Sequence, residues 1–506
     1  MADPIKQTAS DAAPALAAAE YTLTDALKQE TTKTREGIRQ IFKDTRTQGV
    51  VEQAVLGLCQ QLMERGELVS DNALELLNSA IAELDDKLSQ QVNLILHHPD
   101  FQALEGTWRG LEHLVYGTIT GPDLKIRVLN ITKDEIRAVF KQHKGTAWDQ
   151  SPLFKMIYGP YDMPGGEPFG TLIGDYSFNH RAPDLEVLKG MAQIAAAAHA
   201  PFIAGADPSL MGMDSWLELN DPRKLADIFD AKANPEYAGW TSFRASDDAK
   251  YAALAMPRFL ARLPYGKDNE VSGFSFKETH EGGTHANYTW ANAAFAMGAN
   301  ITQSFKTYGW CSKIWGKGAD VSGLNCHTFP TDDGRVDMKC PTEVSIGDRR
   351  DKEMEGVGIV DLRHWQNTDT AAFGNAVNLY QPKEYDDTDA TANSELNAQL
   401  PCIFATSRFA HFIKVMVREA LGQFTTRENM ESWLNKWITN YVCRDASASE
   451  ETKAKLPLAA AEVEVTEVAG KPGYYDATFW LLPHFQLRGV RTSIRLVSKL
   501  PSVKKQ

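Results

Sequence analysis

Between residues 71 and 97, apolar residues recur every three or four positions, the spacing that marks one face of an α-helix. The first helix is predicted from Asp71, whose carboxylate can cap the first turn, to about His97. Pro99 ends this helix, because proline cannot continue the backbone hydrogen bonds. A second helix follows, with an apolar stripe that we expect to pack inward: Phe101, Leu104, Trp108, Leu111 and Val115.

Beyond Gly121, short apolar runs alternate with helical segments, which is typical of an α/β domain. Thr132 and Glu135 form a capping box that opens one helix, and residues 183–199 predict another. The predicted strands are 124–131, 169–174 and 201–206. Residues 266–400 are rich in Gly, Asn, Asp and Thr, and their irregular pattern predicts no element boundaries.

Regular patterns return near Phe404, with helices predicted over 404–424 and 427–441. Strict alternation of apolar and polar residues over 461–468 predicts a strand. Two further strands are predicted at 474–482 and 490–497. The chain therefore ends in a small β-sheet.

These patterns predict a mixed α/β fold in three parts. Residues 1–70 form a helical N-terminal arm, 71–400 a central α/β domain, and 401–506 a C-terminal domain of helices and a small sheet. The first 20 residues have little apolar material to pack, and a short helix is expected after them, with Leu23, Ala26 and Leu27 on one side.

Composition narrows the class of protein. Hydrophobic residues make up 43% and charged residues 24% of the chain, as in globular proteins. The chain contains no run of about 18 apolar residues, the length needed to cross a membrane. The N-terminus lacks the pattern of a secretory signal. Six scattered cysteines without C-x-x-C spacing favour reduced thiols in a cytoplasmic protein. A net charge of −13 argues against nucleic-acid binding, which needs clustered Lys and Arg.

Residues 487–506 carry six basic side chains and no acidic one. One interpretation is a charged sheet edge that discourages aggregation. The other is a surface that docks onto an acidic partner.

No motif predicts nucleotide or cofactor chemistry. Between Gly309 and Gly316-Lys317 lie six residues where a P-loop has four, and Gly318 replaces the magnesium-binding hydroxyl. His280 and His285 are five apart rather than four, yet with acids near Asp332 they leave open a metal-dependent hydrolase. No cofactor is expected.

Eleven segments, taken in order, are similar to the large sheath subunit of bacterial type VI secretion systems, the TssC/VipB family. They are 95–111, 174–178, 199–204, 258–266, 329–334, 339–343, 348–350, 390–393, 407–411, 470–475 and 483–487. Because they extend over positions 95 to 487, the resemblance covers nearly the whole chain.

The resemblance implies a structural protein rather than an enzyme. It implies self-association into a helical sheath with a small TssB/VipA-like subunit, around an inner tube of Hcp and on a baseplate. It also implies recycling by the AAA+ unfoldase ClpV, which in the family grips an N-terminal helix. The best match here is the helix with Leu23, Ala26 and Leu27. A single-chain sheath of the phage-tail type, which needs no small partner, remains an alternative.

The family also implies strands that complete a neighbouring subunit's sheet. The candidates are the N-terminal arm between about Thr31 and Val55 and the C-terminal strands, where Glu462 and Glu464 could form cross-strand pairs with Arg491 and Arg495. The basic strand with Arg491 and Arg495 and the charged face of 427–436 are the candidates for contact with the inner tube. An ordinary intramolecular meander is the alternative for these strands.

Overall fold

The computed structural model describes residues 73–499, apart from gaps at 222–223, 267–268, 273, 280–284, 317, 332, 420–426, 446, 468–474 and 485–493. The described residues fall into two compact units. One combines residues 73–96 with 265–279, and the other combines 97–264 with the described residues from 285 onward. The expected N-terminal helix with Leu23, Ala26 and Leu27 lies outside the described residues.

The first unit contains helix α3 (Ala73–Leu96), which confirms the long helix predicted from the apolar spacing. Asn93 ties this helix to the 265–279 segment, because its side chain donates to Thr279 Oγ1 at 2.8 Å and accepts from the Thr279 backbone N–H at 3.2 Å. Most of its large apolar side chains are exposed within this unit, including Leu84, Leu88 and Ile95.

The second unit is built on a six-stranded sheet. In spatial order the strands are β1 (Leu172–Phe178), β2 (Phe202–Ala206), β3 (Ala252–Met256), β9 (Val360–His364), β10 (Ala371–Phe373) and β6 (Asp320–Val321). The first four are parallel, whereas β10 is antiparallel to both β9 and β6. The mixed fold predicted from the sequence is therefore confirmed.

Alternate side chains of the central strands enter two separate cores, as the two-residue period of a strand requires. In β2, Phe202 and Ala204 pack with helix α7 (Ala182–Ala198) on one face of the sheet. Ile203 packs with helix α10 (Ala293–Tyr308) on the other face. The buried strand predicted at 201–206 and the helix predicted at 183–199 are both confirmed.

Further helices surround the sheet. Thr132 and Glu135 form the predicted capping box at the start of α5 (Lys133–Gln142). The others are α6 (Pro152–Asp162), α8 (Leu225–Ile228), α9 (Ala238–Arg244), α11 (Asp348–Val357) and α12 (Thr388–Leu396). A short antiparallel pair, β4 (Phe259–Leu260) with β5 (Trp290–Ala291), and a small hairpin, β7 (Thr328–Pro330) with β8 (Val336–Met338), complete this part.

The prediction of a strand at 124–131 is wrong. In the described part of the chain, this segment belongs to no strand, and its single bridge is Gly121 to Leu124. Lys125 and Arg127 form ion pairs with Glu167, while Val128 is exposed. An alternating pattern favours an extended backbone, but a strand also needs a neighbour, which the sequence pattern does not reveal.

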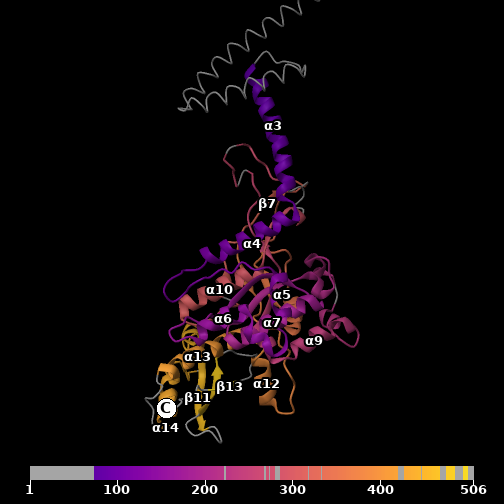
Figure 1. Cartoon of the computed structure of the whole chain (residues 1–506). Coiled ribbons are helices and arrows are strands. Elements are labelled where there is room, and N and C mark those ends of the chain that lie inside the picture. The colour runs from indigo at the N-terminus through magenta and orange to yellow at the C-terminus, as the bar shows by residue number, and fades with distance from the viewer. Residues whose placement is uncertain are drawn as a thin grey trace, which may run out of the picture. The chain divides into compact units, whose positions relative to one another are not determined.

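The C-terminal part contains helices α13 (Leu400–Glu419), α14 (Arg427–Thr439) and α15 (Glu450–Lys455). Its three-stranded sheet has the order β11 (Leu458–Glu467), β12 (Tyr475–Pro483) and β13 (Ile494–Lys499). Figure 1 shows these strands with α14 in the orange and yellow part of the chain. Asn435 fixes α14 to β11, because its side chain donates to Val463 O at 2.7 Å and accepts from Val463 N at 2.9 Å.

Among the described helices, α13 is long and apolar enough to cross a membrane by length and composition, but 72% of that stretch is buried inside the unit. His411 on this helix contacts the Ala198 carbonyl at the end of α7, with 2.9 Å between Nε2 and the oxygen. Phe409 stacks on Trp310, with ring centroids 4.6 Å apart. Helix α13 is thus a core element that joins the C-terminal sheet to the central one.

Candidate assembly surface

Helix α4 (Pro99–Tyr116) packs on the central unit through its glycines. A Cβ atom at Gly106 would lie 2.4 Å from the carbonyl oxygen of Trp290, and one at Gly110 would lie 2.3 Å from the Phe295 ring. Neither distance is compatible with a side chain. The two glycines therefore allow α4 to lie directly against β5 and α10.

The apolar stripe of α4 consequently faces outward. Leu104 is 56% exposed and Trp108 is 64% exposed, and Phe101 and Val115 are also exposed. Only Leu111 is partly buried against the core. The prediction that this stripe packs inward is wrong, because helical spacing identifies an apolar face without revealing whether the same chain covers it.

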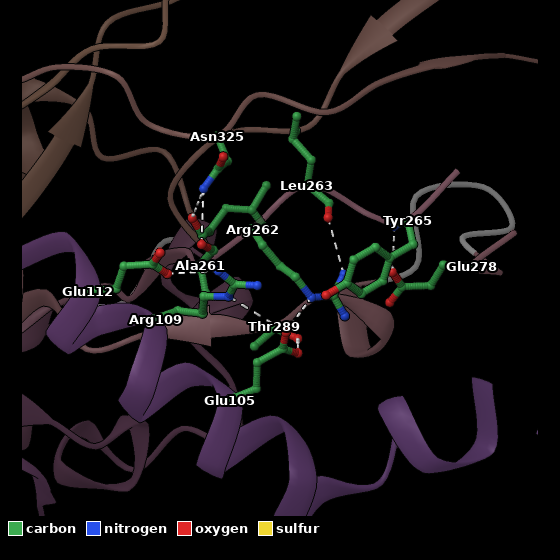
Figure 2. A network of polar contacts seen from close by, with 11 residues as sticks. Glu105, Arg109, Glu112, Ala261, Arg262, Leu263, Tyr265, Glu278, Thr289 and Asn325 are labelled. Carbon is green, nitrogen blue, oxygen red and sulfur yellow. Dashed lines mark hydrogen bonds and ion pairs between the residues drawn. The ribbon is translucent and has the colours of Figure 1, made fainter. Parts of the chain in front are cut away.

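A polar network, buried at Glu105, Arg262 and Thr289, holds the helix in this orientation (Figure 2). Glu105 Oε1 accepts a 2.6 Å hydrogen bond from Arg262 Nε, and Glu105 Oε2 accepts a 3.1 Å bond from the Thr289 hydroxyl. Arg109 Nε lies 3.9 Å from Glu105 Oε1, and Arg109 Nη1 donates to Glu112 at 2.7 Å. The network fixes the angle at which the stripe is presented.

The backbone that carries Arg262 is itself fixed. Asn325 Nδ2 donates to the carbonyls of Leu260 and Ala261 at 3.1 Å, and the Ala261 N–H donates to Thr289 O at 2.9 Å (Figure 2). Arg262 Nη1 also donates to the Leu263 carbonyl at 3.2 Å. Because both ends of the Glu105–Arg262 pair are held, the exposed stripe rests on a rigid support.

We define the assembly stripe as Phe101, Leu104, Trp108, Val115 and Tyr116, all exposed on α4. Contiguous exposed apolar surface is unfavourable in water and usually marks an interaction site. Trp and Tyr are also the residues that contribute most to protein interfaces. The arrangement has the properties of a protein-binding surface.

The C-terminal site residues lie on the three-stranded sheet. In β11, Glu462 and Glu464 are exposed while Val463 and Val465 are buried, which confirms the predicted alternation. Arg491 lies outside the described residues.

Within one chain, the predicted pairs between β11 and β13 are not adjacent, because β12 separates the two strands. Glu462 is opposite Trp480, and Trp480 is opposite Arg495, so the three residues form one row across the sheet. Among the described residues, neither Glu462 nor Glu464 therefore lies directly beside Arg495 of β13. Both strands are edges of the described sheet, so their pairing with another subunit stays a prediction.

The residues of the alternative metal site are only partly described, since His280 and Asp332 lie outside. His285 Nε2 is 3.3 Å from Glu343 Oε1, and Arg258 Nη2 donates to the same oxygen at 2.6 Å. Burial alone would raise the pKa of Glu343, but these bonds from His285 and Arg258 lower it. Among the described residues, no group of three or more His, Cys, Asp or Glu is placed to hold a metal ion.

Two family matches cover most of the chain. Residues 78–379 match the family described as EvpB/VC_A0108, tail sheath N-terminal domain, and residues 389–500 match the EvpB/VC_A0108, tail sheath gpW/gp25-like domain. The chain is 55% identical over 467 residues to the type VI secretion system sheath protein TssC1 of Pseudomonas aeruginosa PAO1, covering 91% of this chain and 93% of that protein.

A solved sheath tail protein from Desulfitobacterium hafniense is also similar, at 10% identity. The alignment covers 62% of this chain and 60% of that one. Its TM-score of 0.29 is too low to support an argument about fold.

Proposed function

Because the chain belongs to the type VI secretion sheath family, we propose that it is the large subunit that co-polymerises with a small sheath subunit into a contractile sheath. The observation that carries this proposal is the 55% identity to a sheath protein over nearly the full length of both chains. Membership in this family implies self-assembly and a small sheath partner.

In this proposal the sheath encloses an Hcp tube, is attached to a baseplate in the cytoplasm, and drives the tube outward when it contracts. The energy is stored in the extended lattice, and a small difference per subunit is multiplied over many copies. Contraction then requires no nucleotide chemistry and no cofactor in this subunit. We propose no enzymatic activity for it.

We assign the assembly stripe on α4 to the contact with the small sheath subunit. Three features support this assignment: the stripe is apolar, it is exposed, and it rests on the Glu105–Arg262 pair. A partner with an apolar face that covers Leu104 and Trp108 would remove this surface from water and contribute favourably to assembly.

The C-terminal strands supply a second set of contacts. We propose that an edge of the β11–β13 sheet pairs with a strand of a neighbouring subunit, because backbone bonds persist while subunits rotate. Arg491 and Arg495 are assigned to the tube contact, and Glu462 and Glu464 to the sheet edge. Reversing the charge of both arginines should weaken tube association, and unchanged association would contradict this role.

Recycling by ClpV is proposed to use the N-terminal helix with Leu23, Ala26 and Leu27. Replacing Leu23 and Leu27 with serine should abolish ClpV binding to contracted sheaths without preventing assembly. Retained binding would place the ClpV contact elsewhere.

Co-expression tests the main proposal. With the small subunit encoded beside it, the chain should form tubules visible by negative-stain electron microscopy, and without it the chain should form none. Tubules from the chain alone would instead favour a single-chain sheath of the phage-tail type. Stoichiometric zinc or manganese in the purified protein would favour the hydrolase alternative with His280, His285 and Asp332.

A further inference from the structure

Two cysteines flank the β7–β8 hairpin, Cys326 before β7 and Cys340 after β8. Its register pairs Thr328 with Met338, and one step further the Lys339 N–H donates to the His327 carbonyl at 2.8 Å. The next residues along the two strands are Cys326 and Cys340. The antiparallel register therefore places these two cysteines opposite each other at the base of the hairpin.

Neighbouring bonds tie both strands to a third segment at this point. The Leu260 N–H donates to Pro341 O at 2.8 Å, and Asn325 Nδ2 donates to Leu260 O at 3.1 Å. The residues that flank the two cysteines thus contact the same residue, Leu260. The base of the hairpin is held together on both strands.

The position in the ladder favours a disulfide. Because the His327–Lys339 pair is hydrogen-bonded, the pair beyond it occupies a non-hydrogen-bonded position, where Cα atoms are about 4.5 Å apart. Disulfides need Cα atoms roughly 4.4 to 6.8 Å apart. The Cα separation expected for this ladder position lies within that range.

The two thiols have different surroundings. Cys340 Sγ lies 3.4 Å from His364 Nδ1 and 3.2 Å from the Thr342 hydroxyl, so an imidazole is in place to accept its proton. Cys326 Sγ lies 3.5 Å from the Thr368 carbonyl. The pKa of Cys326 is raised by burial and by the nearby Asp369 and Cys340. Of these two thiols, we take Cys340 as the first to react, because His364 lies beside it.

Two other described cysteines are much less suited to such chemistry. Burial raises the pKa of Cys311 to about 12 and that of Cys402 still further. Cys443 is partly exposed, but its sulfur lies near its own loop, 3.8 Å from the Asp445 carbonyl.

We propose that Cys326 and Cys340 form a reversible thiol–disulfide modification site that reacts with small-molecule disulfides such as oxidised glutathione. His364 takes the Cys340 proton, and the thiolate attacks one glutathione sulfur, breaking the glutathione S–S bond and releasing one glutathione thiolate. That thiolate then takes the proton from His364. Cys326 then loses its proton to solvent and attacks Cys340 Sγ, releasing the second glutathione as a thiolate that is protonated by water. Two protein thiols and one glutathione disulfide thus give one protein disulfide and two glutathione thiols.

The disulfide would close the hairpin at its base. In a reducing compartment it would form under oxidative conditions and be reversed by thiols. The proposal rests on this hairpin alone and does not depend on the assignment of the chain to a sheath.

The experiment uses the full-length folded protein, incubated with oxidised glutathione and then alkylated. Trypsin cuts after Lys317, Arg335, Lys339 and Arg349, so Cys326 and Cys340 leave in separate peptides, 318–335 and 340–349. Mass spectrometry should find these peptides linked, two hydrogens lighter than their sum, at roughly tenfold the yield of any other cysteine pair, because the strands hold the thiols close together. Dithiothreitol should separate them.

Two variants sharpen the result. Cys326→Ser should stop the reaction at glutathione bound to Cys340, while Cys443→Ser, the matched control, should leave the linked peptides unchanged. The measurement on the unmodified chain needs no variant, so a folding defect in Cys326→Ser does not remove the test. Glutathione retained on both cysteines of the folded protein, or linkage of Cys340 to Cys443 at equal yield, would overturn the proposal.

Discussion

Glu105 Oε1 accepts a 2.6 Å hydrogen bond from Arg262 Nε, with the two side chains only 11% and 7% exposed. The pair links helix α4 to the segment that follows β4. Its position beneath the apolar stripe means that a buried charge pair fixes the orientation of an exposed hydrophobic surface. The pair therefore explains why the side of α4 that carries Trp108 is exposed to solvent.

Glu105→Gln should reduce the free energy of unfolding by about 3 kcal/mol, because a neutral amide replaces the charged carboxylate in the buried Glu105–Arg262 pair. Urea unfolding of the full-length chain measures this change. The matched control is Glu112→Gln, which breaks the more exposed pair with Arg109 and should cost no more than about 0.5 kcal/mol. Equal losses in the two variants would show that burial of the Glu105 pair does not matter.

Gly106→Ala should displace α4, since the new methyl group would lie 2.4 Å from a backbone oxygen that cannot move aside as a side chain can. We expect a loss of roughly 1 to 3 kcal/mol, the usual cost of overpacking. Gly356→Ala in α11 is the control, because nothing lies within 4 Å of its Cβ position. That substitution should be neutral or stabilise the protein by up to about 1 kcal/mol. A well-tolerated Gly106→Ala would contradict the close approach of α4.

Stability should fall as the pH is lowered from 7 to 5. Burial lowers the pKa of His411 to about 3, beside His199, Arg408 and Lys414, so the folded state keeps this ring neutral while the unfolded state gains a proton below pH 6.5. Between these two pKa values the unfolded state binds more protons than the folded state. The contribution of His411 to stability is therefore complete above pH 6.5 and is lost progressively as the pH falls below it.

At pH 5 the contribution of His411 to this loss is about 2 kcal/mol. His411→Gln should therefore flatten the dependence of unfolding free energy on pH, although it lowers stability at pH 7. A pH slope in His411→Gln equal to that of the unmodified chain would show that His411 is not the titrating group.

The sequence predicted well those elements whose structure is decided by residues close together along the chain. Strict alternation at Glu462 to Val465 placed β11 correctly, and the capping box at Thr132 placed the start of α5. In both cases the side chains that decide the structure are neighbours along the chain. Helix α10 was missed, because it is buried on nearly all sides and its apolar residues therefore show no single face.

The candidate site was predicted only in part, because its two decisive features involve distant residues. The sequence identified the stripe with Leu104 and Trp108 but not its outward direction, which follows from Gly106 packing on Trp290. Likewise, the alternation at 490–497 predicted a strand, but not that β12 would separate it from Glu462. Contacts between residues far apart in sequence are set by tertiary packing, which a local pattern does not encode.

The central claim is that the assembly stripe binds the small sheath subunit, and the tubule yield of Trp108→Ser measures it most directly. The variant is co-expressed with the small subunit, and tubules are counted by negative-stain electron microscopy beside Trp365→Ser, which replaces a tryptophan of similar exposure elsewhere on the surface. Because Trp108 is exposed in the free chain, the free energy of unfolding should change by no more than about 0.5 kcal/mol. We predict at least roughly tenfold fewer tubules for Trp108→Ser and an unchanged number for Trp365→Ser. Tubules of Trp108→Ser at the level of the unmodified chain would contradict the account.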